Sequence, residues 1–234
     1  MSRVPVKGNA DVRAAHLPPV HGSWHGFWCF ERLIPALNAR GANVVAVDLP
    51  SVGDDPTALG TLADDAAVIS SAASAVGGPV VVVAHSYGGA ATSEAVFAPN
   101  VEALVFLCAF MPDTGRTYPS YLPPGQLPPY VDPRDDGTMG VTDGLAIPTF
   151  YADCAAETQL WAQALLRPQS QAVVTHAITA ASWRTLASAF VVTTDDAALP
   201  RDSNSGSLSR PRGTTRSPPH TRRSSPDPTN WPRC

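Results

Sequence analysis

The stretch PVVVVAHSYGGAATSEA, residues 79–95, decides the fold. Residues 79–84 are mostly β-branched and apolar, which is typical of a short strand buried on both faces of a parallel sheet. Small residues follow from Gly88 onward, as they do where a helix begins close to a strand. Ser86 lies between the two in the pattern A-H-S-Y-G, a variant of G-x-S-x-G with Ala84 at the first glycine position. The pattern predicts a strained turn that exposes the serine Oγ, although an ordinary strand-to-helix turn would also fit the motif alone.

The segments around this stretch alternate between strand and helix patterns. Residues 43–49 and 101–109 are short apolar runs, and residues 189–194 resume that pattern before two aspartates. Residues 27–40 and 61–76 carry apolar residues at helical spacing and stop at glycines. This alternation predicts an α/β fold with a mostly parallel sheet and helices on both faces.

A long excursion interrupts the alternation. Residues 112–148 are rich in Pro, Gly and Asp, and residues 150–166 return to helical spacing. We expect a helical lid inserted at about 112–180 within a core that spans 20–200. Residues 11–20 make a poor strand, so residues 1–19 are expected to be an irregular N-terminal segment.

Composition limits the class of protein. The chain has 234 residues, with 16 Lys and Arg against 20 Asp and Glu, which fits one soluble domain. No apolar run reaches the roughly 18 residues of a spanning helix, and no signal peptide pattern opens the chain. The four cysteines show no C-x-x-C spacing, so they are expected to be thiols in a cytoplasmic protein.

The last 34 residues differ in kind from the rest. Residues 1–200 carry a balance of −9, whereas residues 201–234 carry 7 Arg against 2 Asp and only Leu208, Trp231 and Cys234 as clearly apolar residues. Such a segment buries too little surface to offset its ordering entropy, so we expect a disordered basic tail. Docking of this tail on nucleic acid through phosphate contacts is the less favoured alternative.

A second motif, His21-Gly22-Ser23-Trp24-His25-Gly26, precedes the first expected helix. A turn there would place the backbone N–H of Ser23 beside Ser86, the candidate nucleophile. The amides of Ser23 and Tyr87 could then form an oxyanion hole. The alternative is a metal site on His21 and His25. We predict no metal, because no acidic third ligand lies nearby and the segment is not helical.

A serine nucleophile needs a base, and the base needs an acid that orients it. Asp195 and Asp196 follow the last expected strand, where the chain order Ser, Asp, His would put the acid. A carboxylate at a helix N-cap or in a solvated loop is the alternative for either residue.

Several motifs together carry a resemblance to a known family. They are HGSWHGFWCF, DLPSVG, AHSYGGAATSEA, FYADC, LRPQS, SWRTLAS and VVTTDDAALP, and they span about residues 20–200. In this order they resemble the α/β-hydrolase superfamily. Within it, they resemble small bacterial esterase-like members that are similar to the plant methylesterase and hydroxynitrile lyase branch.

The resemblance implies an ester hydrolase with a Ser-Asp-His triad, a helical lid and no cofactor. It implies that Ser86 is the nucleophile, that Asp196 is the acid, and that the amides of Ser23 and Tyr87 form the oxyanion hole. The implied partner is a small-molecule ester, and a homodimer is an open possibility for the assembly. We assign substrate contacts to His21, Trp24 and Trp161.

The end of the chain departs from the family pattern. The family continues with a helix, a last strand, a loop that carries the catalytic His, and a closing helix. His220 is the only histidine after Asp196, and its surroundings, SPPHTRR, differ from that loop. His220 is therefore a weak candidate base, and we expect the last strand and helix to be missing.

A base error near each end of the coding sequence would explain this departure. Synonymous codons permit a shifted frame from His220 onward to read HSPFFARPDELAAL, which resembles the family's His loop and closing helix. In that frame Ser follows His, in place of the Lys of the lyase branch, which favours ester hydrolysis. The alternatives are a small-ligand-binding homologue without catalysis and a hydroxynitrile lyase-like C–C lyase.

Overall fold

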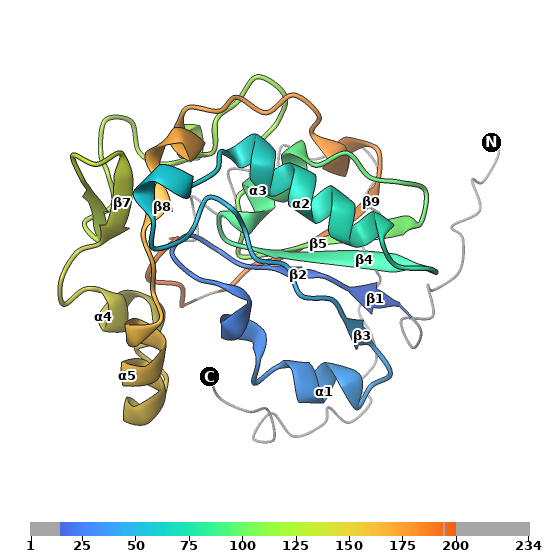
Figure 1. The fold of residues 1–234 in the computed structure, drawn as a ribbon, viewed down its shortest axis with the longest axis horizontal. Helices are drawn as coiled ribbons and strands as arrows, with labels where there is room; N and C mark the ends of the chain where they lie inside the picture. The colour runs from blue at the N-terminus through green and yellow to red at the C-terminus, as the bar shows by residue number, and fades with distance from the viewer. Residues whose placement is uncertain (1–14, 194, 200–234) are drawn as a thin grey trace, which may run out of the picture.

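The central feature of the fold is a parallel sheet between layers of helices (Figure 1). The structure, a computed structural model, describes residues 15–193 and 195–199. The strand order is β3-β1-β4-β5-β9, with β2 also paired to β4, and every pair in this sheet is parallel. Its strands are β1 (His16–Leu17), β2 (Pro19–Val20), β3 (Asn43–Val44), β4 (Val80–His85), β5 (Val101–Leu107) and β9 (Ala187–Val191). The predicted α/β class is confirmed.

Strand β4 occupies the middle of the sheet. Val80, Val82 and Ala84 are fully buried, and the strand pairs with β5 from Val80 opposite Val101 to His85 opposite Leu107. This burial explains the run of β-branched residues, since both faces of a central parallel strand are covered.

Helices cover both faces, as predicted. The helices α2 (Leu62–Ser74) and α3 (Gly88–Glu94) lie on one face of the sheet, and α1 (Ile34–Asn38) lies on the other (Figure 1). Helix α2 begins at a capping box, in which Thr61 Oγ1 accepts from the Asp64 amide and the Asp64 carboxylate accepts from the Thr61 amide.

Two expected helices differ from the prediction, one by being divided and one by being shorter. Residues 27–40 form the short 3₁₀ helix η2 (Phe27–Phe30) and then α1, which begins at Ile34. Pro35 has no N–H and cannot continue a helix from the preceding turn, but it is tolerated in the first turn of a new one. The helix expected at 150–166 is shorter than predicted, because it forms only as α5 (Ala156–Ala164), and a separate short helix, α4 (Ala146–Phe150), ends where the expected one would begin.

The expectation that residues 1–19 are irregular is wrong at the C-terminal end of this segment, where two short strands form. His16–Leu17 pairs with β3 and β4, and Pro19–Val20 pairs with β4. The break between them lies at Pro18, whose carbonyl still accepts from the Val83 amide at 3.2 Å. Prolines weaken the strand pattern in the sequence because they donate no ladder hydrogen bond, yet neighbouring strands hold the segment in place.

The lid contains a small sheet that the sequence pattern did not predict. Strands β6 (Val131–Pro133), β7 (Thr138–Val141) and β8 (Gln169–Ser170) are antiparallel, and α4 and α5 lie beside them (Figure 1). The remaining 3₁₀ helices are η3 (Pro56–Ala58), η4 (Tyr118–Tyr121), η5 (Gln171–Val174) and η6 (Ser182–Arg184).

Several expectations concern residues outside this description. The basic tail at 201–234, the missing last strand and helix, and His220 all lie outside the described residues, as do residues 1–14 and 194. Within the described ranges, no helix is long and apolar enough to cross a membrane.

Candidate active site

Ser86 lies at a tight turn between β4 and α3. Its φ is +52°, which is in the left-handed region that non-glycine residues seldom adopt. The turn is held on both sides, because the Ser86 carbonyl accepts from the amides of Gly89 at 3.1 Å and Phe110 at 3.0 Å. A strained serine fixed in this way presents its hydroxyl away from the sheet, as the sequence pattern predicts.

The two glycines after Tyr87 are required by close packing. A Cβ on Gly88 would lie 2.5 Å from the His21 carbonyl oxygen, and one on Gly89 would overlap the Phe110 carbonyl oxygen. Helix α3 can therefore begin against the loop after β2 and the end of β5 only with glycine at both positions.

The loop after β2 runs directly past Ser86. A Cβ on Gly22 would lie 2.9 Å from the Ser86 Cβ and 3.3 Å from its Oγ. The next residue along this loop is Ser23. We call the strand, turn and helix of residues 79–95 the elbow, and the residue that follows Ser86 in it is Tyr87. Among the described residues, neither of these two backbone amides has a hydrogen-bond acceptor. The geometry is that expected of two donors left for a ligand oxygen.

Asp196 follows β9 and reaches the same cavity. One of its carboxylate oxygens accepts from the amides of Ala198 and Leu199, both at 2.9 Å, and the other accepts from Thr193 Oγ1 at 2.9 Å. These bonds fix the carboxylate on the cavity wall. Asp195 also lines the cavity but is more exposed.

The histidines of the second motif are both buried and bound to the protein. The Leu49 amide donates to His21 Nε2 at 3.0 Å, so the hydrogen is on Nδ1, which contacts the Gly22 carbonyl at 2.9 Å. His21 is not part of the cavity wall. The expected substrate contact by His21 is therefore wrong, because this ring fastens the loop to residue 49 instead.

His25 faces the lid. Its Nδ1 lies 2.7 Å from the Ser23 carbonyl, and its Nε2 lies 2.7 Å from the hydroxyl of Tyr151. Burial lowers the pKa of His21 and of His25 to about 4, so both rings are neutral near pH 7. Because their nitrogens already have protein partners, the geometry gives no support to the metal alternative.

A third imidazole, His85, precedes the nucleophile on β4. It is on the cavity wall, and burial lowers its pKa, while the negative charge of Asp196 raises it in part. His220, the weak candidate base, lies outside the described residues.

The cavity that joins these groups has a volume of about 1110 Å³. Its wall includes Ser86, Ser23 and Asp196, together with aromatic side chains from the loop and the lid. These aromatic residues are Trp24, Trp28, Phe150, Tyr151 and Trp161. The predicted contacts by Trp24 and Trp161 are thus placed at the cavity, whereas Phe150 and Tyr151 were not singled out in the sequence.

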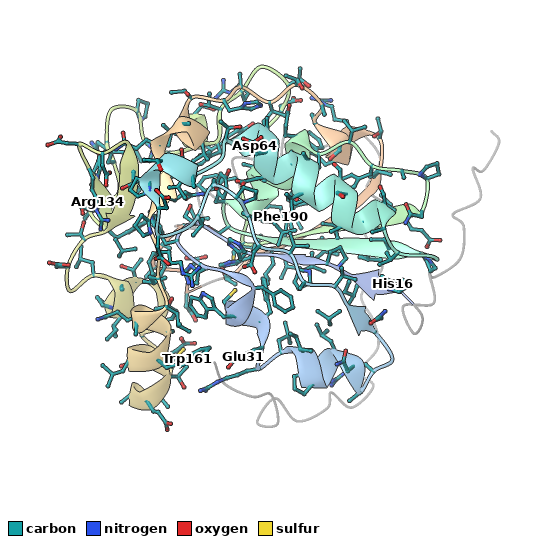
Figure 2. All side chains as sticks on the ribbon, viewed as in Figure 1. His16, Glu31, Asp64, Arg134, Trp161 and Phe190 are labelled. Atoms are coloured by element: carbon teal, nitrogen blue, oxygen red, sulfur yellow. The ribbon has the colours of Figure 1, made fainter. Side chains whose placement is uncertain are left out.

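The aromatic residues pack against one another across the lid boundary. Trp161 on α5 points from the lid toward the turn that holds Trp28, and their ring centroids are 5.3 Å apart (Figure 2). Trp24 donates through Nε1 to the Met139 carbonyl at 3.0 Å, and its ring lies 5.9 Å from that of Phe150. Only the folded chain shows these pairings, since the partners are more than 100 residues apart.

Comparisons with known proteins give the family of the chain. The chain matches the model of the Alpha/beta hydrolase family over residues 20–223. It is 40% identical over 111 residues to Methylesterase 7 of Arabidopsis thaliana, covering 44% of this chain and 42% of that protein. It is 37% identical over 108 residues to a probable esterase of Oryza sativa subsp. indica, covering 43% and 41%. The aligned part thus spans less than half the length of these relatives.

Solved structures share the fold. A pyrethroid hydrolase from Sphingobium faniae JZ-2 superposes with a TM-score of 0.72 at 20% identity, over 86% of each chain. A methylesterase from Arabidopsis superposes with a TM-score of 0.68 at 21% identity, over 83% of this chain and 84% of that one.

Proposed function

Because the chain belongs to the alpha/beta hydrolase family, we propose that it is a serine hydrolase that cleaves carboxylic esters of small molecules through an acyl-enzyme. One observation carries the proposal: Ser86, held at a strained turn, lines the same cavity as Asp196 and as Ser23, whose backbone amide is a proposed oxyanion-hole donor. The relatives named esterase and methylesterase support the same chemistry.

In the proposed reaction, Ser86 Oγ bonds to the ester carbonyl carbon as its proton passes to the base. The amides of Ser23 and Tyr87 donate to the oxygen that becomes negative in the tetrahedral intermediate. When the intermediate collapses, the carbon–oxygen bond to the alcohol breaks, and the alcohol leaves with the proton from the base. Water then attacks the acyl-enzyme by the same route and releases the acid.

Asp196 is the proposed acid of the triad, and His220 is the weak candidate for its base. Asp196 would accept from the base and fix its tautomer, and the three hydrogen bonds that hold its carboxylate favour one orientation. His220 follows Asp196 in the chain order that this fold uses. The predicted test is His220→Ala, which should lower kcat by roughly 10³-fold or more if this ring is the base.

The cavity walls favour an apolar substrate. Trp28, Phe150 and Trp161 supply aromatic surface, and the polar groups gather near Ser86 and Asp196. A small ester with an apolar acyl or alcohol group would bury its hydrophobic part against these rings. The alternatives, a non-catalytic binder and a C–C lyase, receive no support from the names of the relatives.

Three further proposals concern setting and partners. We place the protein in the cytoplasm, we disfavour a nucleic-acid partner, and we keep a homodimer as an open possibility for its assembly. The thiols of Cys29 and Cys108, which form no disulfide, agree with a reducing compartment.

The decisive test is covalent labelling with an alkyl fluorophosphonate, followed by mass spectrometry of the labelled peptide. Labelling at Ser86 that disappears in Ser86→Ala is the expected result. Ser23→Ala is the matched control and should retain labelling, because the proposed role of Ser23 belongs to its backbone amide. If the purified chain is folded and Ser86 is not labelled, the proposal is wrong.

A further inference from the structure

A chain of buried polar side chains connects the elbow to the lid. The Tyr87 hydroxyl donates to one oxygen of Asp65 at 2.6 Å, and the other oxygen accepts from the Ser51 amide at 2.9 Å. Gln169 Nε2 donates to Ser51 Oγ at 3.1 Å. All four side chains are completely buried. Three of them lie within residues 51–87, and the fourth, Gln169, is distant in the sequence.

One end of this chain is the residue next to the nucleophile. Tyr87 carries the second oxyanion-hole amide, and its ring is sealed in the core, 5.4 Å from the ring of Tyr118. Since the Tyr87 side chain and its amide share one Cα, a shift of the ring would move the amide. Oxyanion-hole donors are effective only within a few tenths of an ångström of their distance to the ligand oxygen.

The other end is β8, an edge strand of the lid sheet. Gln169 lies in β8, which pairs with β7, and it also forms an antiparallel bridge with Val52. Two backbone bonds fasten the same strand, from the Ser170 amide to the Ser51 carbonyl at 2.8 Å and from the Gly53 amide to the Pro168 carbonyl at 3.1 Å. Ser51 is therefore the point at which the lid meets Asp65.

A carboxylate at this place is costly for stability. Burial raises the pKa of Asp65 to about 6, although its hydrogen bonds to Tyr87 and Ser51 counteract the shift. Well-packed apolar side chains of similar volume often stabilise a core at least as well as a buried charge. A role in fixing one arrangement of Tyr87 explains why an acid at this position is useful.

We propose that Asp65 is a positioning residue, which fixes the oxyanion-hole amide of Tyr87 through the tyrosine hydroxyl and couples that amide to the lid through Ser51 and Gln169. The inference rests on the proposed hydrolase function for its catalytic meaning. Its structural content, the coupling of the Tyr87 peptide to Asp65 and β8, can be measured without turnover.

The variant that tests it is Tyr87→Phe, with Tyr118→Phe as the matched control. Both remove one buried tyrosine hydroxyl in the same aromatic pair, and only the first removes a hydrogen bond to Asp65. We expect Tyr87→Phe to lower kcat by about tenfold with little change in KM, because the loss falls on the transition state. The same variant should slow fluorophosphonate labelling of Ser86 to a similar degree, and Tyr118→Phe should stay within about twofold of the parent in both measurements.

A second readout uses backbone amide NMR of the full chain. Tyr87→Phe should shift the amide resonances of residues 86–89 and of Gln169 and Ser170 in the lid, while Tyr118→Phe should leave the lid resonances in place. A purely structural role would lower the melting temperature in both variants without this pattern. If Tyr87→Phe does not fold, Asp65→Asn, which keeps the size and one acceptor, replaces it in both measurements.

The outcomes separate the two proposals. If the parent chain is not labelled at Ser86, the hydrolase proposal fails, and the amide shifts alone decide whether Asp65 positions Tyr87. Amide shifts that stop short of β8, or that are equal in the two variants, overturn the coupling. Labelling of the parent with unchanged kcat in Tyr87→Phe overturns the positioning role while leaving the hydrolase intact.

Discussion

The elbow and the lid are built in opposite ways. Residues 79–95 hold the strand, the serine and the helix in one continuous stretch, and most of these residues are themselves buried. The lid wall depends on partners far away in the chain, such as His25 with Tyr151 and Arg32 with Thr158, each separated by 126 residues. The turn that carries Ser86 is thus encoded locally, whereas the shape of the proposed substrate cavity is a product of tertiary packing.

The largest expected effect concerns Asp196, the proposed acid, whose turn is contacted by a residue of the lid. Asp196→Asn should reduce kcat by roughly 10⁴-fold, because an amide can hold the base in the wrong tautomer. Tyr130, a lid residue, donates to the Ala198 carbonyl at 2.9 Å in the Asp196 turn, so Tyr130→Phe should have a much smaller effect. Steady-state hydrolysis of an aryl ester measures both, and equal losses would contradict the division between elbow chemistry and lid packing.

The second prediction compares a glycine in each region. Gly88→Ala should destabilise the fold by about 3 kcal/mol, because the new Cβ meets the His21 carbonyl and the backbone there cannot yield. Gly125 in the lid has φ +71° and open space around it, so Gly125→Ala should cost only about 1 kcal/mol of backbone strain. Urea unfolding gives both values. A larger cost in the lid would show that the elbow is less tightly packed than the structure indicates.

The third prediction uses pH to probe the loop beside the elbow. The folded pKa of His25 is about 4, below its usual 6.5, so the stability that its neutral form contributes is lost as the pH falls through this window. At pH 4.5 the loss should be about 2 kcal/mol. His21 acts in the same direction, whereas Asp65, with a pKa raised to about 6, gains stability as it becomes protonated below that pH.

The measurement is the free energy of unfolding between pH 7 and pH 4.5 for the parent and for His25→Gln. The variant should show a shallower loss of stability toward acid pH, because glutamine does not titrate. An identical pH dependence in the two proteins would mean that His25 is not buried in the neutral form.

The smallest effects are expected for single side chains of the lid, one buried and one exposed. Tyr151→Phe removes the hydrogen bond to His25 and should cost about 1 kcal/mol, whereas Leu160→Ala should lie within about 0.5 kcal/mol of the parent. Leu160 is 65% exposed on α5 and contributes little apolar burial. Thermal unfolding of both variants sharpens the comparison, and a greater cost at Leu160 would indicate that this surface is covered in solution.

Sequence patterns predicted the alternation of strands and helices along the chain but not every boundary of these elements. The buried strands β4 and β5 and the capped helix α2 follow from apolar runs and from the Thr61 cap, which are local signals. The strand at Pro19 and the small lid sheet were missed, because proline and short polar strands carry weak patterns and are stabilised by their neighbours.

The candidate site divides in the same manner. Ser86, Asp196 and the loop at Ser23 were proposed because each stands in a motif at a strand end, and the structure brings all three to one cavity. His21 was misassigned, since the sequence shows a histidine near the nucleophile but not that its ring nitrogens bind Gly22 and Leu49. Tyr151 carried no signal of its own, because its partner His25 is distant in the chain.

The sequence by itself determined the elbow, the alternation of strands and helices, and the positions of the candidate nucleophile and acid. These features depend on short-range steric preferences and hydrophobic periodicity, which are visible within a few residues. The tertiary structure alone decided the aromatic cavity wall and the buried line from Tyr87 through Asp65 and Ser51 to Gln169. Such contacts join groups that only the packed core brings together, because burial forces each polar atom to find whichever partner lies nearest in space.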